Sequence, residues 1–333
     1  IVTAATAIEA GYGDFLINDS GSVKIGGHIF NNAGKKAYGD ITMREAIKYS
    51  SNVFFSSISQ KFSKKSFEYM TDEFFITKKI PFDLDVKSSK LDFDAMDNVE
   101  VASTSIGQGK LQVSPLNMAL VACAIANDGT IMKPYIVSKA YYEKGSSIYK
   151  AKSSVLSSPI KKKTAKQITE YMVDCVKGGT GTRAQLGNIT VAGKTGTTTG
   201  NVDLWFCGYT PYYTASIWSG FDNNFSQIDT KYQQIMWRTI MERIHAEKEL
   251  PYKEFTVPDS VVTAKICTKS GKLAIDGICD HASGVPPSVP NILQKVRFLW
   301  KNAMFTSKLP SVPIPRSWQV PVVLRNMLPK KYC

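Results

Sequence analysis

The fold is decided by the stretch NITVAGKTGTTTGNVDLWFCGYTPYYTASIWSGF, residues 188–221. It contains three runs rich in β-branched and aromatic residues, namely 188–193, 203–209 and 213–221. Such runs, separated by turn residues, predict β-strands. Thr210, Pro211 and Tyr212 form a connection short enough for a hairpin. The stretch therefore predicts consecutive strands of an antiparallel sheet.

Helical patterns surround this sheet on both sides in the sequence. Residues 1–10, IVTAATAIEA, place Ile and Val on one face of a helix that ends at Gly11. A capping Ser114 followed by Pro115 predicts a helix that runs to Gly129. Further helices are predicted over residues 41–60, 161–178 and 229–247. Helices packed against an antiparallel sheet predict an α+β fold.

Length and composition are those of a globular chain. The 333 residues are 43% hydrophobic and 21% charged. No apolar run approaches the length of a membrane span, and no signal peptide is recognisable. Ile1 opens inside an apolar helical pattern, so we expect that residues are missing upstream, including any membrane anchor.

The excess of basic over acidic residues does not predict nucleic-acid binding. The formal net charge is +13, but residues 281–333 hold eight Lys and Arg and no acidic residue, so the rest carries 13 − 8 = +5. There is no zinc-finger spacing, RNP motif or basic helix interleaved with aromatic residues. Eight of the fifteen prolines also lie from residue 284 onward. We expect residues 284–333 to be a poorly ordered basic tail, not a domain.

The six cysteines include no CxxC pair, which argues against a zinc site, and no metal or cofactor is predicted. Cys267 and Cys279 bracket a short segment that either closes as a disulfide hairpin or holds two free thiols. This segment belongs to a C-terminal extension, residues 248–283, which follows a main domain over residues 1–247. Three other cysteines are expected to be buried, namely Cys123, Cys175 and Cys207. His245 is expected to be exposed to solvent.

The strongest local motif is Lys194-Thr195-Gly196, followed by Thr197, at the end of a predicted strand. The Lys194 cation can hold a carboxylate and lower a neighbouring pKa. Thr195 and Thr197 alternate along the strand, so both hydroxyls can lie on one side. Gly196 lets a substrate backbone approach. A motif of three residues is short, and a solvated strand end is the alternative.

The second motif is Ser50-Ser51-Asn52, inside a helical apolar segment. These residues compete with the helix backbone for hydrogen bonds. One interpretation is a helix break or an N-cap for the next helix. The functional interpretation is a loop in which the Ser50 hydroxyl transfers a proton and the Asn52 amide holds a substrate carbonyl.

Together these motifs resemble the penicillin-binding proteins and serine β-lactamases, in which Ser-x-x-Lys, Ser-x-Asn and Lys-Thr-Gly follow in that order. Four longer stretches, which lie within residues 1–281, strengthen the resemblance: GDITMREAIKYSSNVFF, SIGQGKLQVSPLNMALVACAIANDGTIMKPYIV, GGTGTRAQLGNITVAGKTGTT and DLWFCGYTPYYTASIWSGFDNN. The resemblance implies a sheet of about five antiparallel strands with helices on both faces.

The first family motif is not present in its usual place. In the family, Ser-Thr-Phe-Lys leads directly into a segment like IVTAATAIEAG, so the nucleophilic serine and its lysine are expected immediately before Ile1. Ser147-Ile148-Tyr149-Lys150 and Ser158-Pro159-Ile160-Lys161 fit Ser-x-x-Lys, but both lie in the wrong order along the chain. We expect them to be surface residues.

The resemblance implies a peptidoglycan D,D-transpeptidase that works through an acyl-serine intermediate and binds penicillin. Its implied partners are the peptidoglycan stem peptide or its lipid-linked precursor, and β-lactam antibiotics, with no nucleic acid. The implied place is the outer face of the bacterial cell membrane. The implied site residues are Ser50, Asn52 and Lys194 for catalysis, and Thr195, Gly196 and Thr197 for substrate binding, with the Thr197 N–H in the oxyanion hole.

Several hypotheses stay open at the level of sequence. A β-lactam sensor, a β-lactamase of the same fold and a non-catalytic cell-wall scaffold would share these motifs, and the basic tail could make an interaction module. The stretch around Gly107-Gln108-Gly109 resembles monofunctional class B proteins, whereas residues 203–279 resemble bifunctional class A proteins.

Overall fold

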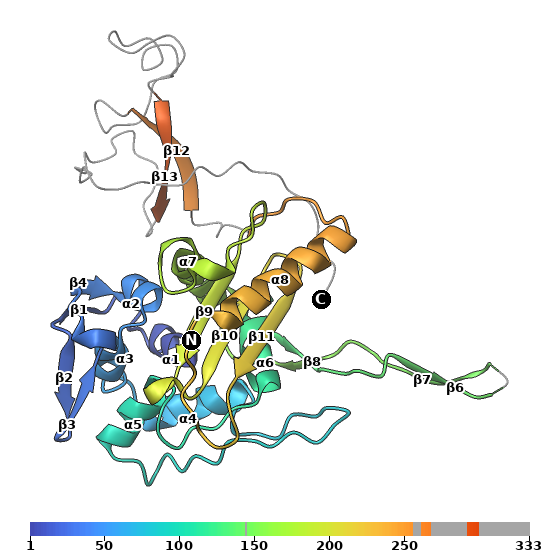
Figure 1. Cartoon of the computed structure of the whole chain (residues 1–333), viewed down its shortest axis with the longest axis horizontal. Coiled ribbons are helices and arrows are strands. Elements are labelled where there is room, and N and C mark those ends of the chain that lie inside the picture. The colour runs from blue at the N-terminus through green and yellow to red at the C-terminus, as the bar shows by residue number, and fades with distance from the viewer. Residues whose placement is uncertain (144, 256–260, 268–291, 300–333) are drawn as a thin grey trace. The chain divides into compact units, whose positions relative to one another are not determined.

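The computed structural model describes residues 1–143, 145–255, 261–267 and 292–299 (Figure 1). The chain forms two compact units, of which the first is Ile1–Phe255 and the second Thr256–Tyr332. In the second unit, β12 (Val261–Cys267) pairs antiparallel with β13 (Ile292–Leu299). The predicted segment limits at 247 and 283 remain predictions. Cys279 lies outside the described residues, so the choice between a disulfide with Cys267 and two free thiols stays open; most of the tail also lies outside them.

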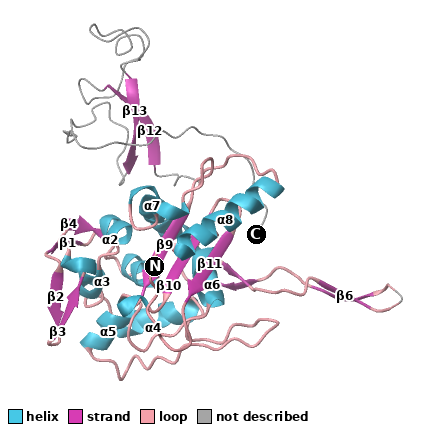
Figure 2. Ribbon diagram, viewed as in Figure 1, coloured by secondary structure: helices cyan, strands magenta, loops and turns pink. Residues whose placement is uncertain are grey.

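The first unit is built on a three-stranded antiparallel sheet of order β11-β10-β9 (Figure 2). Its strands are β9 (Ala192–Thr197), β10 (Leu204–Tyr209) and β11 (Thr214–Ser219). All three predicted strands are present. The first begins later than predicted and continues past Gly193 to Thr197, because those residues pair with β10. Lys194 is therefore inside the strand, opposite Cys207.

The described residues place three strands in this central sheet, against about five implied by the family resemblance. Eight further strands in this unit form separate antiparallel pairs: β1 (Leu16–Asp19) with β4 (Gly39–Thr42), β2 (Ser22–Ile25) with β3 (His28–Asn31), β5 (Ile131–Met132) with β8 (Val155–Ser157), and β6 (Lys139–Tyr141) with β7 (Ser147–Lys150). The β1–β4 segment matters most here, because it packs beside the helices that hold the second sequence motif.

The predicted helices are all present, and the structure adds two that the sequence patterns did not predict, α4 and α5. In chain order the helices are α1 (Val2–Glu9), α2 (Met43–Tyr49), α3 (Asn52–Ile58), α4 (Lys64–Glu73), α5 (Asn98–Ser105), α6 (Pro115–Ala126), α7 (Lys162–Gly178) and α8 (Tyr232–Glu247). Short 3₁₀ turns lie at Ala33–Lys35, Thr182–Ala184 and Thr199–Asn201. The predicted cap at Ser114 is formed, since its Oγ accepts the Asn117 N–H at 3.1 Å.

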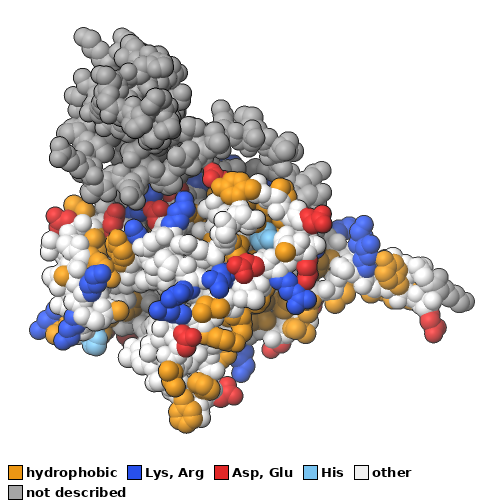
Figure 3. Space-filling view, turned by 45° about the horizontal axis from the view of Figure 1, so that its top comes forward, with side chains coloured by type: hydrophobic (Ala, Val, Ile, Leu, Met, Phe, Trp, Pro, Cys, Tyr) orange, Lys and Arg blue, Asp and Glu red, His pale blue; other side chains and the backbone are white. Residues whose placement is uncertain are grey.

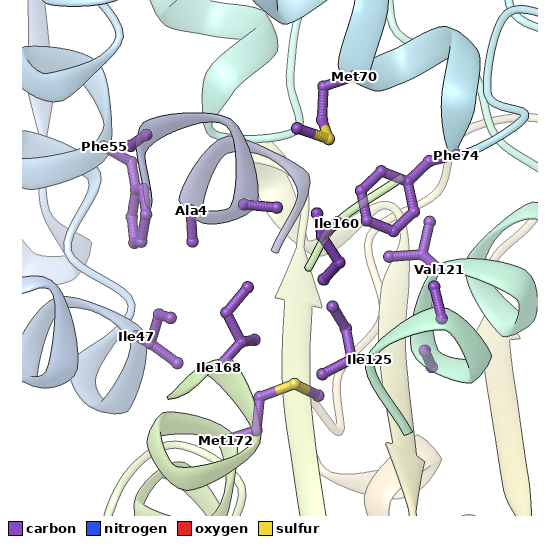
Figure 4. Close-up of a cluster of buried hydrophobic side chains, with 14 of the residues drawn as sticks. Ala4, Ile47, Phe55, Met70, Phe74, Val121, Ile125, Ile160, Ile168 and Met172 are labelled. Carbon is purple, nitrogen blue, oxygen red and sulfur yellow. The ribbon is translucent and has the colours of Figure 1, made fainter. Parts of the chain in front are cut away.

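Helices cover both faces of the sheet, as the α+β prediction requires. Successive side chains of a strand point to opposite faces. Cys207 and Tyr209 of β10 therefore pack into the larger core, which α1, α6 and α7 supply, whereas Phe206 packs with Trp237 and Met241 of α8. Figure 4 shows part of the larger core, to which Ala4 of α1, Ile125 of α6 and Met172 of α7 contribute side chains. The sheet is thus held rigidly, and the site at its edge is held with it.

Two expectations about individual side chains differ from the structure. His245 is buried, not solvated, because α8 packs this turn against the β10–β11 connection, where the His245 Nε2 lies 3.1 Å from Thr210 Oγ1. Cys123 is only partly buried, whereas Cys175 and Cys207 are buried as predicted. The Ser and Lys of both misplaced Ser-x-x-Lys matches are exposed as predicted, whereas Pro159 and Ile160 of the second match are buried.

The surface in view does not concentrate charge of one sign. Figure 3 shows Lys and Arg side chains scattered among acidic, neutral and hydrophobic ones on the described part of the chain. In that same part, the helices are all too short or too polar to cross a bilayer.

Candidate active site

The second sequence motif forms a tight junction between two helices. Ser50 ends α2 in the left-handed conformation, with φ 58° and ψ 50°, which is uncommon for a residue other than glycine. Ser51 then caps α3, because its Oγ accepts the Phe54 N–H at 2.9 Å. The motif therefore breaks one helix and caps the next, as the first interpretation predicts, and it presents the Ser50 hydroxyl on a sharp turn.

Lys194 on β9 reaches this junction from the other side of the site. Its Nζ donates a hydrogen bond to Ser50 Oγ and another, of 2.8 Å, to the carbonyl oxygen of Thr195. Burial lowers the pKa of Lys194 below its ordinary value. The two motifs predicted from sequence are therefore brought together, and they are joined by a direct hydrogen bond.

Thr180 is a member of the site that the sequence motifs did not assign. Its Oγ1 lies 2.8 Å from Thr195 Oγ1 and 3.4 Å from Ser50 Oγ, so it bridges the two motifs. Its N–H donates to the carbonyl oxygen of Lys48 at 3.1 Å, which fixes the loop after α7 against the end of α2. The signal in the sequence was the Gly178-Gly179 pair, since a close backbone approach needs residues without Cβ.

Gly179 is the member of the pair that the close approach requires. A Cβ at this position would lie 2.2 Å from the carbonyl oxygen of Lys48, far inside contact distance. The α7 loop can therefore approach α2 only with glycine here. This close approach is what brings Thr180 next to Ser50.

The remaining predicted residues line the same cleft. Asn52 donates its Nδ2 to the carbonyl oxygen of Asn31 at 2.8 Å, which fixes the side-chain amide. Thr197 is exposed at the end of β9. A Cβ on Gly196 would meet Trp205 Cβ at 3.1 Å, so packing as well as substrate approach favours glycine.

The cleft has a volume of about 580 Å³, within the ordinary range for ligand sites. All six predicted site residues line it, and so do Ile1 and Thr180. Burial, together with the nearby charge of Lys194, lowers the pKa of the Ile1 amino group to about 5. The start of α1 thus lies in the cleft, close to the lysine of β9.

The Cys207 thiol near Lys194 is not activated as a nucleophile. Burial raises the pKa of Cys207, whose backbone pairs with Lys194, to about 11. Cys175 Sγ lies 3.4 Å from Thr180 Oγ1. Within the described residues, no group of three or more His, Cys, Asp or Glu side chains is arranged to hold a metal ion.

The site thus combines a lysine strand, a Ser-x-Asn turn and the start of a buried helix around one cleft, on a sheet with helices on both faces. The chain belongs to the family of the penicillin-binding protein transpeptidase domain, whose pattern it matches over residues 1–234.

Relatives and solved structures agree with this assignment. The chain is 33% identical over 244 residues to penicillin-binding protein 1A of Clostridium botulinum, an alignment that covers 71% of this chain and 27% of that protein. The chain thus spans little more than a quarter of the length of this relative.

Among solved structures, the D,D-transpeptidase domain of a peptidoglycan glycosyltransferase from Eggerthella lenta is similar with a TM-score of 0.64 and 29% identity, covering 73% of this chain and 64% of that one. The fold is also shared with PBPA from Mycobacterium tuberculosis, with a TM-score of 0.65, 21% identity and coverage of 72% and 58%.

Proposed function

We propose that this chain forms the substrate cleft of a peptidoglycan D,D-transpeptidase that acts through an acyl-serine intermediate. The observation that carries the proposal is the convergence of Lys194, Ser50, Thr180 and Thr195 at one cleft, next to the start of α1. A partly buried ammonium surrounded by hydroxyl groups is suited to a carboxylate. The substrate is therefore a peptide with a free carboxylate near the scissile bond, as in a D-Ala-D-Ala terminus.

Each residue has a role in this proposal. Lys194 and Thr195 bind the terminal carboxylate, and Thr197 orients it. The Asn52 amide, fixed by Asn31, binds the substrate amide. The Ser50 hydroxyl, which accepts a hydrogen bond from Lys194, passes a proton to the departing D-alanine.

The nucleophilic serine and its lysine are proposed to precede Ile1, in a Ser-x-x-Lys sequence. The position of the Ile1 amino group, beside Lys194 in the cleft, supports this, because the residues before it would continue α1 into the cleft. The serine oxygen attacks the penultimate D-Ala carbonyl, and its proton passes to the lysine. Two N–H groups, from the serine and Thr197, bind the oxyanion.

The reaction is completed by the second substrate. Ser50 delivers its proton to the departing D-alanine and regains one from the lysine that took the serine proton, and the serine ester remains. The amine of another stem peptide then attacks the ester carbonyl, forms the cross-link and restores the serine hydroxyl. β-Lactams would acylate the same serine.

We further propose that the chain is the transpeptidase portion of a bifunctional, class A protein at the outer face of the cell membrane. The Eggerthella lenta structure supports this, because it is described as the D,D-transpeptidase domain of a peptidoglycan glycosyltransferase. So does the greater length of the Clostridium botulinum relative.

The test compares two ligands and two chains. The chain should bind a diacetyl-Lys-D-Ala-D-Ala peptide more tightly than the same peptide with a C-terminal carboxamide, by isothermal titration calorimetry. It should form no covalent adduct with a fluorescent penicillin, whereas a chain extended by its native upstream sequence should be labelled stoichiometrically. Equal affinity for the two peptides would refute the carboxylate site. Labelling of the chain itself would refute the proposed place of the nucleophile, and loss of the label within minutes would favour a β-lactamase.

A further inference from the structure

A buried carboxylate lies directly beneath the Ser50–Asn52 turn. Asp19, the last residue of β1, is completely buried. In the described part of the chain it takes part in no ion pair. A buried carboxylate without a cationic partner is costly unless several hydrogen bonds satisfy it. The groups that donate hydrogen bonds to Asp19 therefore indicate which part of the structure this carboxylate positions.

Three donors converge on Asp19. The Gly21 N–H donates to Oδ1 at 2.8 Å, and the Asn32 Nδ2 donates to both oxygens at 2.8 and 2.9 Å. The third donor is Ser51 Oγ, which lies 2.6 Å from Oδ2. Ser51 and Asn32 are themselves almost fully buried. The carboxylate is thus satisfied, and one of its partners lies between the two proposed site residues Ser50 and Asn52.

The same two partners hold the beginning of α3. Ser51 Oγ accepts the Phe54 N–H at 2.9 Å, and Asn32 Oδ1 accepts the Val53 N–H at 3.1 Å. The first N–H groups of a helix have no partner inside the helix. In α3, two of these N–H groups donate hydrogen bonds to side chains that Asp19 orients. The position of Asn52, the first residue of α3, therefore depends on Asp19.

We infer that Asp19 is a positioning residue for the cleft: through Ser51 and Asn32 it fixes the turn that presents the Ser50 hydroxyl and the Asn52 amide to the substrate. The inference rests on the proposed function. It goes beyond the family motifs, because Asp19 lies outside all of them and touches no cleft residue that would bind substrate directly. Lys194 defines one side of the site, and the Asp19 network defines the other.

The substitution D19N tests this inference with almost no change in volume. The substitution replaces one acceptor oxygen of Asp19 by an NH₂ group, which is a donor. Because the groups around Asp19 are themselves donors, the hydrogen bonds to Ser51 and Asn32 cannot all persist. D40N is the matched control, because Asp40 lies on the adjacent strand β4 and pairs only with the exposed Asn18. Both substitutions remove one negative charge from the same strand pair.

The measurement is the affinity for the D-Ala-D-Ala peptide in the full chain, at a temperature at which circular dichroism shows each variant to be folded. We expect D19N to weaken binding about tenfold, as loss of a hydrogen bond to a charged group would, and D40N to leave it within about twofold. In ¹⁵N–¹H spectra, the Ser50 and Asn52 amide signals should move in D19N and not in D40N. A purely structural role would lower the melting temperature of D19N without changing the affinity of the folded protein.

Two further variants keep the inference testable if D19N does not fold. S51A removes only the hydroxyl that links Asp19 to the turn, and should weaken peptide binding in the same way. The double variant D19N/N32D exchanges amide and carboxylate within the network, and Ser51 Oγ already lies 3.5 Å from Asn32 Oδ1. The exchange should recover part of the affinity that D19N loses.

The outcomes separate this inference from the proposed function. If the unmodified chain does not prefer the carboxylate peptide over the carboxamide, the proposed function fails. If the unmodified chain shows that preference, and D19N and S51A bind the peptide as tightly as it does, Asp19 is not a positioning residue and the proposed function stands.

Discussion

Lys194 donates a hydrogen bond from its ammonium group to Oγ of Ser50, although the two residues lie 144 positions apart in the chain. The contact joins β9 to the α2–α3 junction and closes one side of the cleft. It also explains why a left-handed residue occurs at Ser50, since that conformation turns the hydroxyl out of α2 toward the sheet. The predictions below follow from the groups around this contact.

Replacing the buried cation tests the carboxylate site directly. K194M keeps the length of the side chain and removes its charge. We expect the affinity for the D-Ala-D-Ala peptide to fall by about 10- to 100-fold, because a hydrogen bond to a charged group contributes ~1.5–3 kcal/mol. Affinity for the carboxamide peptide should change little. K177M, at an exposed lysine of α7, is the control for loss of charge alone.

Stability should respond differently from binding in K194M. Lys194 is partly buried, and desolvation lowers its pKa, so its charge destabilises the folded state and the apolar replacement should not lower the melting temperature. If K194M bound the peptide weakly because it was unfolded, its melting temperature would be lower than that of the unmodified chain. In that case the loss of binding would not support a carboxylate site.

The Thr180 hydroxyl should contribute to the same subsite. T180V removes the hydroxyl with little change in shape, and thereby the 2.8 Å contact with Thr195 Oγ1. We expect the carboxylate peptide to bind about 2- to 10-fold more weakly, as for loss of one hydrogen bond of ~0.5–1.5 kcal/mol. T180S keeps the hydroxyl and should bind nearly as tightly as the unmodified chain. Equal affinities for T180V and T180S would contradict a role for this hydroxyl.

The close approach of the α7 loop to α2 should be sensitive to a single methyl group. In G179A the new Cβ would lie 2.2 Å from the Lys48 carbonyl oxygen, so the loop must move and the Thr180 N–H bond to Lys48 is disturbed. We expect the free energy of unfolding to fall by about 1–3 kcal/mol, as for overpacking elsewhere. Urea denaturation measures this. G187A is the control, because a Cβ there meets no atom within 4 Å.

In the 333-residue chain whose first residue is Ile1, the free amino group of that residue makes stability depend on pH. Burial lowers its pKa from 8.0 to about 5, so between these values the unfolded chain binds more protons than the folded one. The free energy of unfolding should therefore rise as the pH increases from 5 to 8, and this gain should disappear as the pH falls back to 5. The gain is about 1.4 kcal/mol for each unit by which the folded and unfolded pKa values differ. Urea denaturation across this pH range gives the slope.

Acetylation of the Ile1 amine removes the titrating charge and should flatten this rise. His245, whose pKa is also lowered by burial, should leave a smaller rise that ends near its ordinary value of 6.5 in both chains. Identical pH profiles with and without acetylation would show that the amine is not buried beside Lys194.

Local signals in the sequence were strong where one short segment decides its own conformation. The alternation around 203–209, the Ser114-Pro115 helix start and the Ser50-Ser51-Asn52 interruption all correspond to elements of the structure. The sequence pattern predicts a first strand that begins and ends earlier than β9, because a glycine such as Gly193 is typical of a strand end. Pairing of β9 with β10 carries the strand through it.

The sequence by itself determined the three strands of the central sheet, the helices of the first unit other than α4 and α5, the order of the two motifs and the family to which they point, because hydrophobic periodicity and capping are local properties. Only the tertiary structure decided which side chains meet. Thr180, Lys194 and Ser50 come from three distant segments, and Asp19 reaches the site only through Ser51. Contacts between such segments depend on how helices and strands pack, and no local pattern records that packing.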